Sequence, residues 1–283
     1  MSLALSTTRF APSPTGRLHL GHAMSAVLSH DFARARGGRF LLRIEDIDSG
    51  RAREEHIAGI EEDLCWLGLL WDGPAVRQSR RLALYSEALE RLKQRGLIYP
   101  CFCTRADIAR SATAPHGPEG PLYPGTCRGL AAPDLDRPHA WRLDMVKAMA
   151  LAGPLEWYDE QAGIVTARPD LLGDVVLARK DAPVSYHLAV TVDDAAQGVT
   201  DVIRGRDLFA ATHVHRLLQD LLTLPTPDYH HHALLIGTDG ERLAKRHGAM
   251  ALADLRAQGV DPKEIVAALH EGRAPLGFRL SGD

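Results

Sequence analysis

The sequence has 283 residues, 45% hydrophobic and 24% charged, which is typical of a soluble globular protein with one large domain plus insertions. A formal net charge of −3 excludes the basic excess that accompanies nonspecific nucleic-acid binding, so any RNA contact must be local and DNA is not expected as a partner. No apolar run approaches the ~20 residues that span a bilayer, and residues 1–8 lack a signal-peptide pattern, so we expect a cytoplasmic protein without a membrane partner.

The first part of the chain predicts a strand, a turn, a helix and a second strand. Residues 8–14 form a strand that proline must end, because proline fixes φ and donates no ladder hydrogen bond, and a turn follows at 15–16. From Gly21 the apolar spacing is helical until residues 37–38, and residues 39–44 form the next strand. Such units build parallel sheets, whose ligands bind at the carboxyl ends of the strands.

The rest of the chain continues an α/β pattern around a segment of different composition. Helices are predicted near residues 51–67, 80–96, 212–222, 251–258 and 262–270, and strands over 174–178 and 185–192. Residues 101–137 are rich in proline and glycine, and we expect them to form an inserted subdomain.

The four cysteines divide by spacing into one isolated residue and one group. Cys65 lies among apolar residues at helical spacing, which predicts a place in the core. Cys101, Cys103 and Cys127 lie close together in the inserted segment. In a reducing compartment this grouping indicates metal binding or burial rather than a disulfide.

Two short motifs carry chemistry that suits a nucleotide. His19-Leu20-Gly21-His22 opens the predicted first helix, where free N–H groups and imidazoles can meet phosphate, although so short a motif also recurs by chance. Residues 239–248 put basic side chains on a glycine-flanked loop that could close over a triphosphate. Taken alone, this loop has the pattern of an exposed charged turn.

Together with several longer blocks, these motifs resemble the glutamyl-tRNA synthetases, and most closely their short paralogue family, the glutamyl-queuosine tRNA(Asp) synthetases. The blocks follow the family's order: RFAPSPTG at 9–16 with HLGH, LRIEDID at 42–48, DLCWLGLLW at 63–71, YHLAVTVDD at 186–194 and VIRGRDL at 202–208. The resemblance runs from about Arg9 to the region of His270, which makes it specific.

The resemblance implies a Rossmann-type parallel-sheet catalytic core with a zinc-containing inserted acceptor-binding subdomain and C-terminal stem-contact helices. The implied boundaries are 1–98 and 186–236 for the two halves of the catalytic domain, 99–185 for the insertion, and 237–283 for a KMSKS-like loop with the stem-contact helices.

The resemblance also implies a ligase reaction. ATP with Mg²⁺ would activate L-glutamate as an adenylate, and a monomeric enzyme would pass glutamate to the queuosine base of tRNA(Asp). The α-carboxylate of glutamate attacks the α-phosphorus of ATP, so catalysis consists mostly of positioning and charge stabilisation.

Motif matches assign the glutamate-binding residues. These are Arg9 and Ser13 on the first strand, Glu45 on the second, Tyr186 and Arg204. Two carboxylates and one ammonium group need arginine forks and one carboxylate, and Glu45 would pair with the ammonium group. Two alternatives remain open: Glu45 and Asp46 as solvated strand-end acids, and Tyr186 as a core aromatic.

For ATP the resemblance assigns His19, Gly21, His22 and Lys245, with His19, His22 and Lys245 as the catalytic residues. Lys245 aligns with the last lysine of the family's KMSKS loop. Arg242 and Ala244 depart from the pattern at the first lysine and at the serine, so the loop keeps its charges and loses a hydroxyl. We expect activity to be retained with an altered affinity for ATP.

One structural zinc ion is expected on Cys101, Cys103, Cys127 and Tyr123, because the queuosine-type paralogues use tyrosine as the fourth ligand. His116 is the rival ligand, since imidazole is the commoner one, and thiols buried without metal are the other alternative. The histidines at 213, 215 and 230–232 are predicted to be surface or packing residues, because consecutive side chains of an extended segment point to opposite faces.

The number of residues that follow the recognisable core helps to predict which acceptor receives glutamate. The recognisable core extends to about His270, so we expect no anticodon-binding domain, which favours a modified base over a tRNA 3′ end. Three alternatives remain: a truncated glutamyl-tRNA synthetase that charges a tRNA 3′ end with a partner chain for the anticodon, another nucleotidylyltransferase, and a non-catalytic RNA-binding paralogue. Intact HLGH and Lys245 argue against the last.

Overall fold

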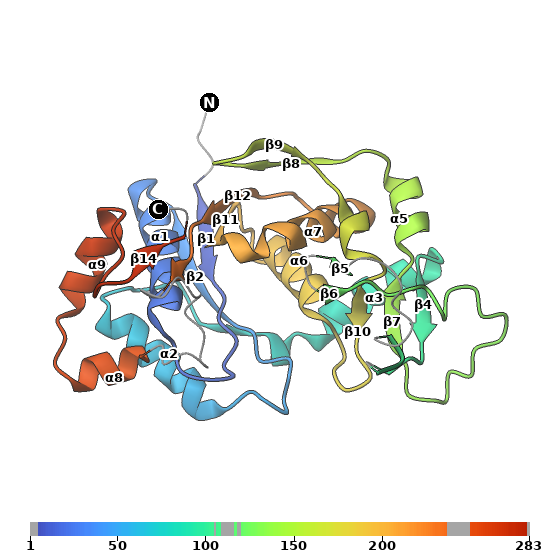
Figure 1. Ribbon diagram of the computed structural model, residues 1–283, viewed down its shortest axis with the longest axis horizontal. Helices are drawn as coiled ribbons and strands as arrows, with labels where there is room; N and C mark the ends of the chain where they lie inside the picture. The colour runs from blue at the N-terminus through green and yellow to red at the C-terminus, as the bar shows by residue number, and fades with distance from the viewer. Residues whose placement is uncertain (1–4, 105, 109–115, 118–119, 237–249, 282–283) are drawn as a thin grey trace. The chain divides into compact units, whose positions relative to one another are not determined.

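The computed structural model describes residues 5–104, 106–108, 116–117, 120–236 and 250–281 (Figure 1). The chain forms two compact units. The first unit comprises Met1–Ser79, Val199–Asp207 and Pro227–Asp283, and the second comprises Arg80–Gly198 and Leu208–Thr226. Among the helices described, none combines the length and the apolar character needed to cross a membrane.

Parallel strands form the centre of the first unit. β1 (Thr7–Phe10), β2 (Arg39–Ile44) and β3 (Val76–Arg77) pair in that order, with Thr7 opposite Arg39. β11 (Asp201–Gly205) pairs in parallel with β12 (Asp228–His232). β1 lies beside β11, where the Thr200 amide donates to the Thr7 carbonyl at 2.9 Å.

Two contacts, one of them made by helix α1 (Leu20–Ala35), show that these strands run in the same direction. Thr7 and Thr200 contact each other at the start of β1 and β11. Ser25, near the start of α1, contacts His232 at the end of β12 with 2.9 Å between Oγ and Nε2. The end of β1 leads into α1, so the carboxyl ends of β1 and β12 lie at the same edge of the sheet, where α/β proteins bind their ligands.

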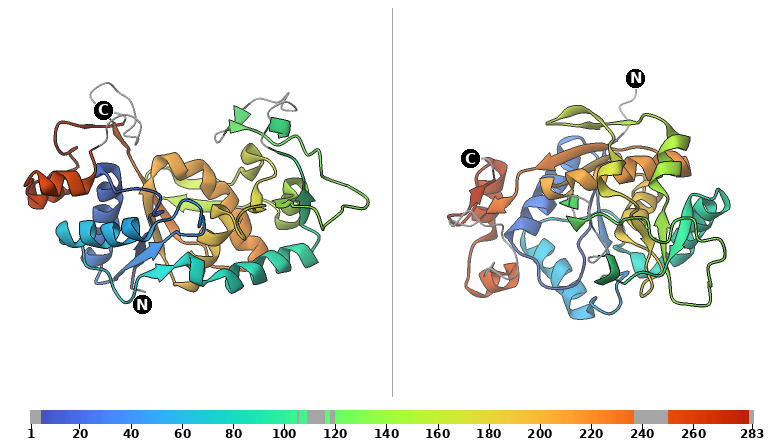
Figure 2. Two further views of the ribbon diagram at one scale, coloured as in Figure 1. Left: turned by 90° about the horizontal axis from the view of Figure 1, so that it is seen from below. Right: turned by 45° about the vertical axis from the view of Figure 1, so that its right-hand side comes forward.

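Three further helices cover the first unit, and their sequences explain where they begin. α2 (Glu54–Trp66) carries two acidic residues in its first turn, which favours the positive end of the helix dipole. α9 (Pro262–His270) has Pro262 at its first position and the Asp261 carboxylate accepting from the Lys263 amide at 2.9 Å. α8 (Leu252–Ala257) packs on α2, and α9 packs on α1 (Figures 1 and 2). The two short strands β13 (Leu235–Ile236) and β14 (Arg279–Leu280) pair antiparallel.

The second unit combines short antiparallel sheets with helices. Its sheets are β10 (Val176–Ala178), β7 (Ala140–Leu143) and β4 (Ile98–Cys101) in that order, the hairpin of β8 (Glu156–Asp159) with β9 (Gly163–Thr166), and the pair β5 (His116–Gly117) with β6 (Gly120–Pro121). Its helices are α3 (Leu82–Gln94), α5 (Met145–Ala152), α6 (Tyr186–Ala196) and α7 (Phe209–Leu222). The Asp193 carboxylate on α6 accepts from Arg81 and from the Tyr85 hydroxyl, both at 2.7 Å, which joins α6 to the start of α3.

The described residues also include three 3₁₀ turns: η1 (Gln78–Arg80), η2 (Pro169–Leu172) and η3 (Arg206–Leu208).

Three predictions about the fold are wrong. The first strand, expected over residues 8–14, ends at Phe10. Residues 186–192, expected within a strand over 185–192, form the start of α6, because this helix is buried on almost every side and its sequence therefore lacks an amphipathic period. Cys65 has the predicted helical setting in α2, but its side chain is exposed, since it lies off the face formed by Ile57, Ile60 and Leu64.

Candidate functional site

The two histidines of the HLGH motif cap helix α1. The Gly21 amide donates to His19 Nδ1 at 3.1 Å, and the His19 amide donates to His22 Nδ1 at 3.1 Å. The two imidazole rings lie 3.8 Å apart between centroids. Because both Nδ1 atoms accept hydrogen bonds, each neutral ring carries its proton on Nε2. The start of α1 therefore presents two Nε2–H donors suited to an anion.

Gly21 is required for this arrangement of the rings. A Cβ atom at residue 21 would lie 3.0 Å from Cε1 and 3.1 Å from Nδ1 of His19. A side chain at residue 21 would therefore require the His19 ring to shift by a few tenths of an ångström.

Charged side chains gather at the strand ends of the first unit. Arg9 on β1 and Arg204 on β11 are 4% and 5% exposed. Glu45 directly follows β2, and its side chain is 9% exposed. Ser13 was expected on the first strand, but it lies exposed in the loop three residues beyond Phe10. The structure therefore places two guanidinium groups and one carboxylate, all buried, on neighbouring strands.

Arg43 is a member of this group that sequence reasoning missed. Its side chain is fully buried, and Nη2 lies 3.4 Å from Glu45 Oε1. The signal was present in the LRIEDID block, because residues two apart on a strand share a face. Arg43 thus fixes the carboxylate that was predicted to bind an ammonium group.

Asp46 has a structural role in the same loop. Its carboxylate accepts from the Ser79 amide at 2.8 Å and from the Ser79 hydroxyl at 2.7 Å. Both oxygens are therefore used to hold the turn after β3, and Asp46 is buried rather than the solvated strand-end acid of the alternative prediction.

The three consecutive histidines of β12 point to alternate faces, as predicted. His230 contacts the Asp201 carboxylate at 3.2 Å and His232 contacts Ser25, whereas His231 between them is 4% exposed and contacts Arg204. Burial lowers the pKa of His232, against the raising effect of its hydrogen bond to the Ala233 carbonyl.

Tyr186 begins helix α6 in the second unit. Its ring is half-buried and lies edge-on to His215, with centroids 5.6 Å apart. The buried side chain of His187 contacts His215 with 3.2 Å between Nδ1 and Nε2. A half-buried ring at a helix start does not match a fully packed core aromatic.

The predicted metal ligands come together in the second unit. The Sγ atoms of Cys101, Cys103 and Cys127 all lie within 4.8 Å of one another. The Cys103 and Cys127 sulfurs are 3.6 Å apart, and Tyr123 Oη lies 3.4 Å from Cys101 Sγ and 3.6 Å from Cys103 Sγ. A tetrahedral zinc ion with bonds of about 2.3 Å to sulfur and about 2.0 Å to oxygen needs S···S near 3.8 Å and S···O near 3.5 Å. The four side chains therefore fit zinc.

The surroundings of this cluster act in opposite directions on the pKa values of two of its thiols. Burial raises the pKa of Cys127, but hydrogen bonds, first that with Tyr123, lower it to about 7, whereas burial raises the pKa of Cys103 to about 11. The Cys127 amide donates to Tyr123 Oη at 2.8 Å, and the Arg142 guanidinium lies 4.0 Å from the Tyr123 ring centroid. The side chain of His116, the rival ligand, lies outside the described residues.

The predicted residues of the KMSKS-like loop are Lys245, Arg242 and Ala244. They fall within residues 237–249, which lie outside the described residues.

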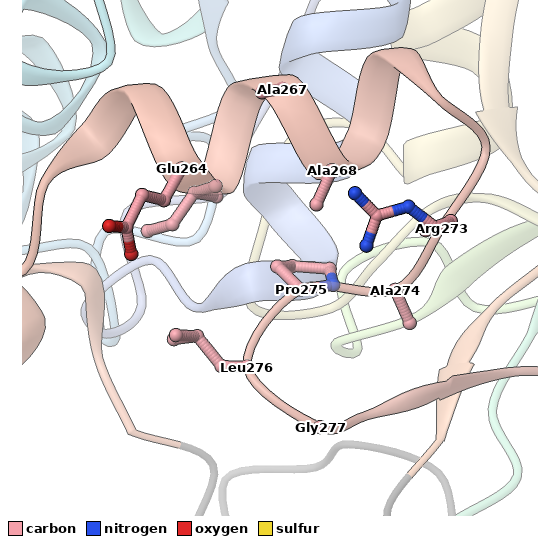
Figure 3. Close-up of a pocket in the computed structure, with 9 residues that line it drawn as sticks. Glu264, Ala267, Ala268, Arg273, Ala274, Pro275, Leu276 and Gly277 are labelled. Carbon is pink, nitrogen blue, oxygen red and sulfur yellow. The ribbon is translucent and has the colours of Figure 1, made fainter.

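A cavity of about 400 Å³ lies between α9 and the turn that follows it (Figure 3), lined by residues 264, 265, 267, 268 and 273–277. Of the predicted site residues that the structure describes, none lines this cavity.

Comparison with known proteins identifies the family. The family model for tRNA synthetases class I (E and Q), catalytic domain, matches residues 6–274. The chain belongs to this family. It is therefore an enzyme of the ligase class, and the predicted α/β architecture with a parallel sheet is confirmed.

Two relatives of this class I synthetase carry the same name. The glutamyl-Q tRNA(Asp) synthetase of Rhodobacter capsulatus is 54% identical over 270 residues, covering 91% of this chain and 97% of the relative. The glutamyl-Q tRNA(Asp) synthetase of Nocardia farcinica is 47% identical over 264 residues, covering 92% of this chain and 82% of that relative.

Solved structures of longer synthetases share the fold of this class I synthetase. A glutamate tRNA ligase from Elizabethkingia meningosepticum, crystallised in complex with its amino acid, matches with a TM-score of 0.77 and 26% identity. The glutamate-tRNA synthetase of Elizabethkingia anophelis matches with a TM-score of 0.78 and 25% identity. Both matches cover 94% of this chain, but the chain spans only 60% and 61% of those structures.

Proposed function

We propose that this class I synthetase activates L-glutamate with ATP and Mg²⁺ and transfers glutamate to the queuosine base of tRNA(Asp). The observation that carries the choice of amino acid is the buried pair Arg9 and Arg204 together with Glu45, because glutamate bears two carboxylates and one ammonium group. The choice of acceptor is supported by the shared name of relatives that match along most of their length.

The proposed roles follow from the chemistry of each side chain. Arg9 and Arg204 bind carboxylates, Glu45 binds the ammonium group, and Ser13 and Tyr186 complete the glutamate site. An oxygen of the α-carboxylate bonds to the α-phosphorus of ATP while the bond to the bridging oxygen breaks, and pyrophosphate leaves with that electron pair. Nε2–H of His19 and His22 together with Lys245 bind the phosphates and stabilise the charge that develops. Gly21, which was also assigned to ATP, contributes by donating its amide to Nδ1 of His19 and so holding that ring in place.

The domain boundaries proposed from the sequence give each segment a task. Residues 1–98 and 186–236 would form the catalytic domain, 99–185 the acceptor-binding insertion with zinc, and 237–283 the phosphate-binding loop and stem-contact helices. The cysteine cluster supports a metal in the insertion, because all of its ligands lie within 101–127.

The acceptor can be tested with matched RNA substrates. We expect radiolabelled glutamate to be transferred to tRNA(Asp) that contains queuosine and not to queuosine-free tRNA(Asp) of the same sequence, because the base supplies the nucleophile. Acid-precipitable label measures the product. Equal labelling of the queuosine-containing and the queuosine-free tRNA(Asp) would contradict a queuosine acceptor.

A second candidate is transfer to the 3′ end of tRNA(Glu), which the similarity to glutamate tRNA ligases favours. Nuclease digestion of the labelled tRNA separates the two, since label on the anticodon-loop fragment supports queuosine and label on the terminal adenosine supports the second candidate. Glutamate-dependent pyrophosphate exchange separates both from a non-catalytic RNA-binding protein.

Zinc in the cysteine cluster gives a prediction with an internal control. We expect about one zinc per chain in protein purified without chelator, because the four side chains have tetrahedral spacing. The Cys127→Ser variant should lose most of the zinc and unfold at a lower temperature, since a structural zinc ion adds binding energy to folding.

The matched control for this test is Cys65→Ser, which changes an exposed cysteine outside the cluster and should leave both properties unchanged. Elemental analysis and thermal unfolding provide the measurements. Wild-type protein without zinc would count against the metal and in favour of buried thiols.

A further inference from the structure

We propose that His231 is a positioning residue for the glutamate site and that it acts by holding the guanidinium of Arg204. This inference rests on the proposed function, in which Arg204 binds a carboxylate of glutamate. It gives a role to a histidine that the sequence indicated only as surface or packing.

The sheet brings the two residues together. β11 and β12 pair in parallel with Arg204 directly opposite His231. Nε of Arg204 lies 3.1 Å from Nε2 of His231, and the residues are 5% and 4% exposed. A buried hydrogen bond from a charged donor to a neutral acceptor is stronger than one between two neutral groups.

The chemistry of the two groups fixes the direction of this hydrogen bond. Guanidinium carries five N–H donors and no acceptor, so Arg204 donates and His231 Nε2 accepts. The His231 ring is therefore neutral, with its proton on Nδ1. A guanidinium held through Nε can still present its Nη1–Nη2 edge to a carboxylate as a bidentate fork.

An aromatic ring makes a second contact with the same guanidinium. Tyr229 precedes His231 by two residues and shares its face of β12. Its ring centroid lies 5.3 Å from Arg204 Cζ, and its ring is parallel to that of His231 within 4°. Arginine side chains lose much rotamer freedom on binding, so a guanidinium held in advance by two neighbours should bind a carboxylate more tightly.

The neighbouring histidines show that the contact with Arg204 is specific to residue 231. His230 and His232 lie on the opposite face of β12, where they contact Asp201 and Ser25. His230 therefore offers a matched control, because it is a partly buried imidazole on the same strand whose described contacts are with Asp201 and Phe32 rather than with Arg204.

The experiment compares variants in ATP–pyrophosphate exchange, with and without tRNA(Asp), as glutamate and ATP are varied separately. We expect His231→Leu to raise KM for glutamate about tenfold and to leave KM for ATP unchanged. The tenfold change corresponds to the loss of one hydrogen bond to a charged group. His231→Gln should stay within about threefold of wild type, because its Oε1 can replace Nε2 as the acceptor. His230→Gln should match wild type.

Two outcomes would overturn the proposal. One is an unchanged KM for glutamate in folded His231→Leu, and the other is an equal loss in the leucine and glutamine variants, which would indicate packing alone. If the leucine variant does not fold, His231→Asn replaces it, since the shorter amide cannot reach Arg204.

A second measurement keeps the two proposals separable. The Arg204 Nε–H resonance in ¹⁵N NMR should exchange slowly with water in wild type and rapidly in His231→Leu. If that difference in hydrogen exchange is seen but wild type shows no glutamate-dependent ATP–pyrophosphate exchange, the proposed function fails while the contact stands. If ATP–pyrophosphate exchange depends on glutamate but the Arg204 Nε–H of wild type exchanges rapidly with water, only the positioning role fails.

Discussion

Replacing Arg204 with alanine is expected to lower kcat/KM for glutamate in pyrophosphate exchange by about 100-fold or more, because it removes a buried guanidinium from a carboxylate and leaves that charge without its partner. The effect should fall on glutamate rather than ATP, since the groups assigned to the phosphates lie at the start of α1. Steady-state exchange kinetics with each substrate varied in turn measure both parameters.

Two further variants sharpen this test. Arg206→Ala removes an exposed arginine two residues along the chain and should leave glutamate kinetics unchanged. Arg204→Lys keeps the positive charge but loses the planar fork and the contact with His231, so it should recover only part of the activity. Full activity in Arg204→Lys would show that charge alone matters and would contradict a bidentate contact.

Replacing Gly38 with alanine is expected to destabilise the protein by about 3 kcal/mol or more. A Cβ atom at this residue would lie 2.0 Å from the Ser6 carbonyl oxygen, which accepts a hydrogen bond from the Arg39 amide at 2.8 Å. The substitution must therefore separate β1 from β2 at the point where they begin to pair. Urea denaturation of the variant and the wild type measures the difference.

The adjacent glycine supplies the control. Gly37 has a φ of 62° with nothing within 4 Å of a Cβ atom, so Gly37→Ala meets only the strain of the left-handed region, about 1 kcal/mol. If Gly37→Ala proved as damaging as Gly38→Ala, close approach of the strands would not explain the need for glycine.

The sequence predicted best those elements whose ends carry a local signal. Residues 39–44 and 262–270 form a strand and a helix with the predicted bounds, because a helix cap or a glycine pair marks their ends. α6 was mistaken for a strand because residues 187–194 are all buried, so its side chains do not separate into an apolar face and a polar face. The hairpin β8–β9 was not predicted, although aromatic and β-branched residues flank its turn and the residues of β8 alternate between exposed and buried.

In the candidate site, too, the sequence predicted some residues and missed others. Motifs pointed to Arg9, Glu45 and Arg204, and the structure places them at strand ends of one unit. The residues that hold them were missed, because the choice of His231 as the partner of Arg204 depends on the register between two strands. One strand's sequence does not specify that register.

The double cap at the start of α1 has a consequence for how a nucleotide would be received. Helix starts usually offer unused amide groups to phosphate, but here the Gly21 amide is already satisfied by the His19 ring. In the proposed function, an incoming phosphate therefore meets the imidazole edges in place of that amide, so the two rings that cap the helix are also the groups assigned to the ligand. On that proposal, folding of the first turn of α1 also places the phosphate-binding groups.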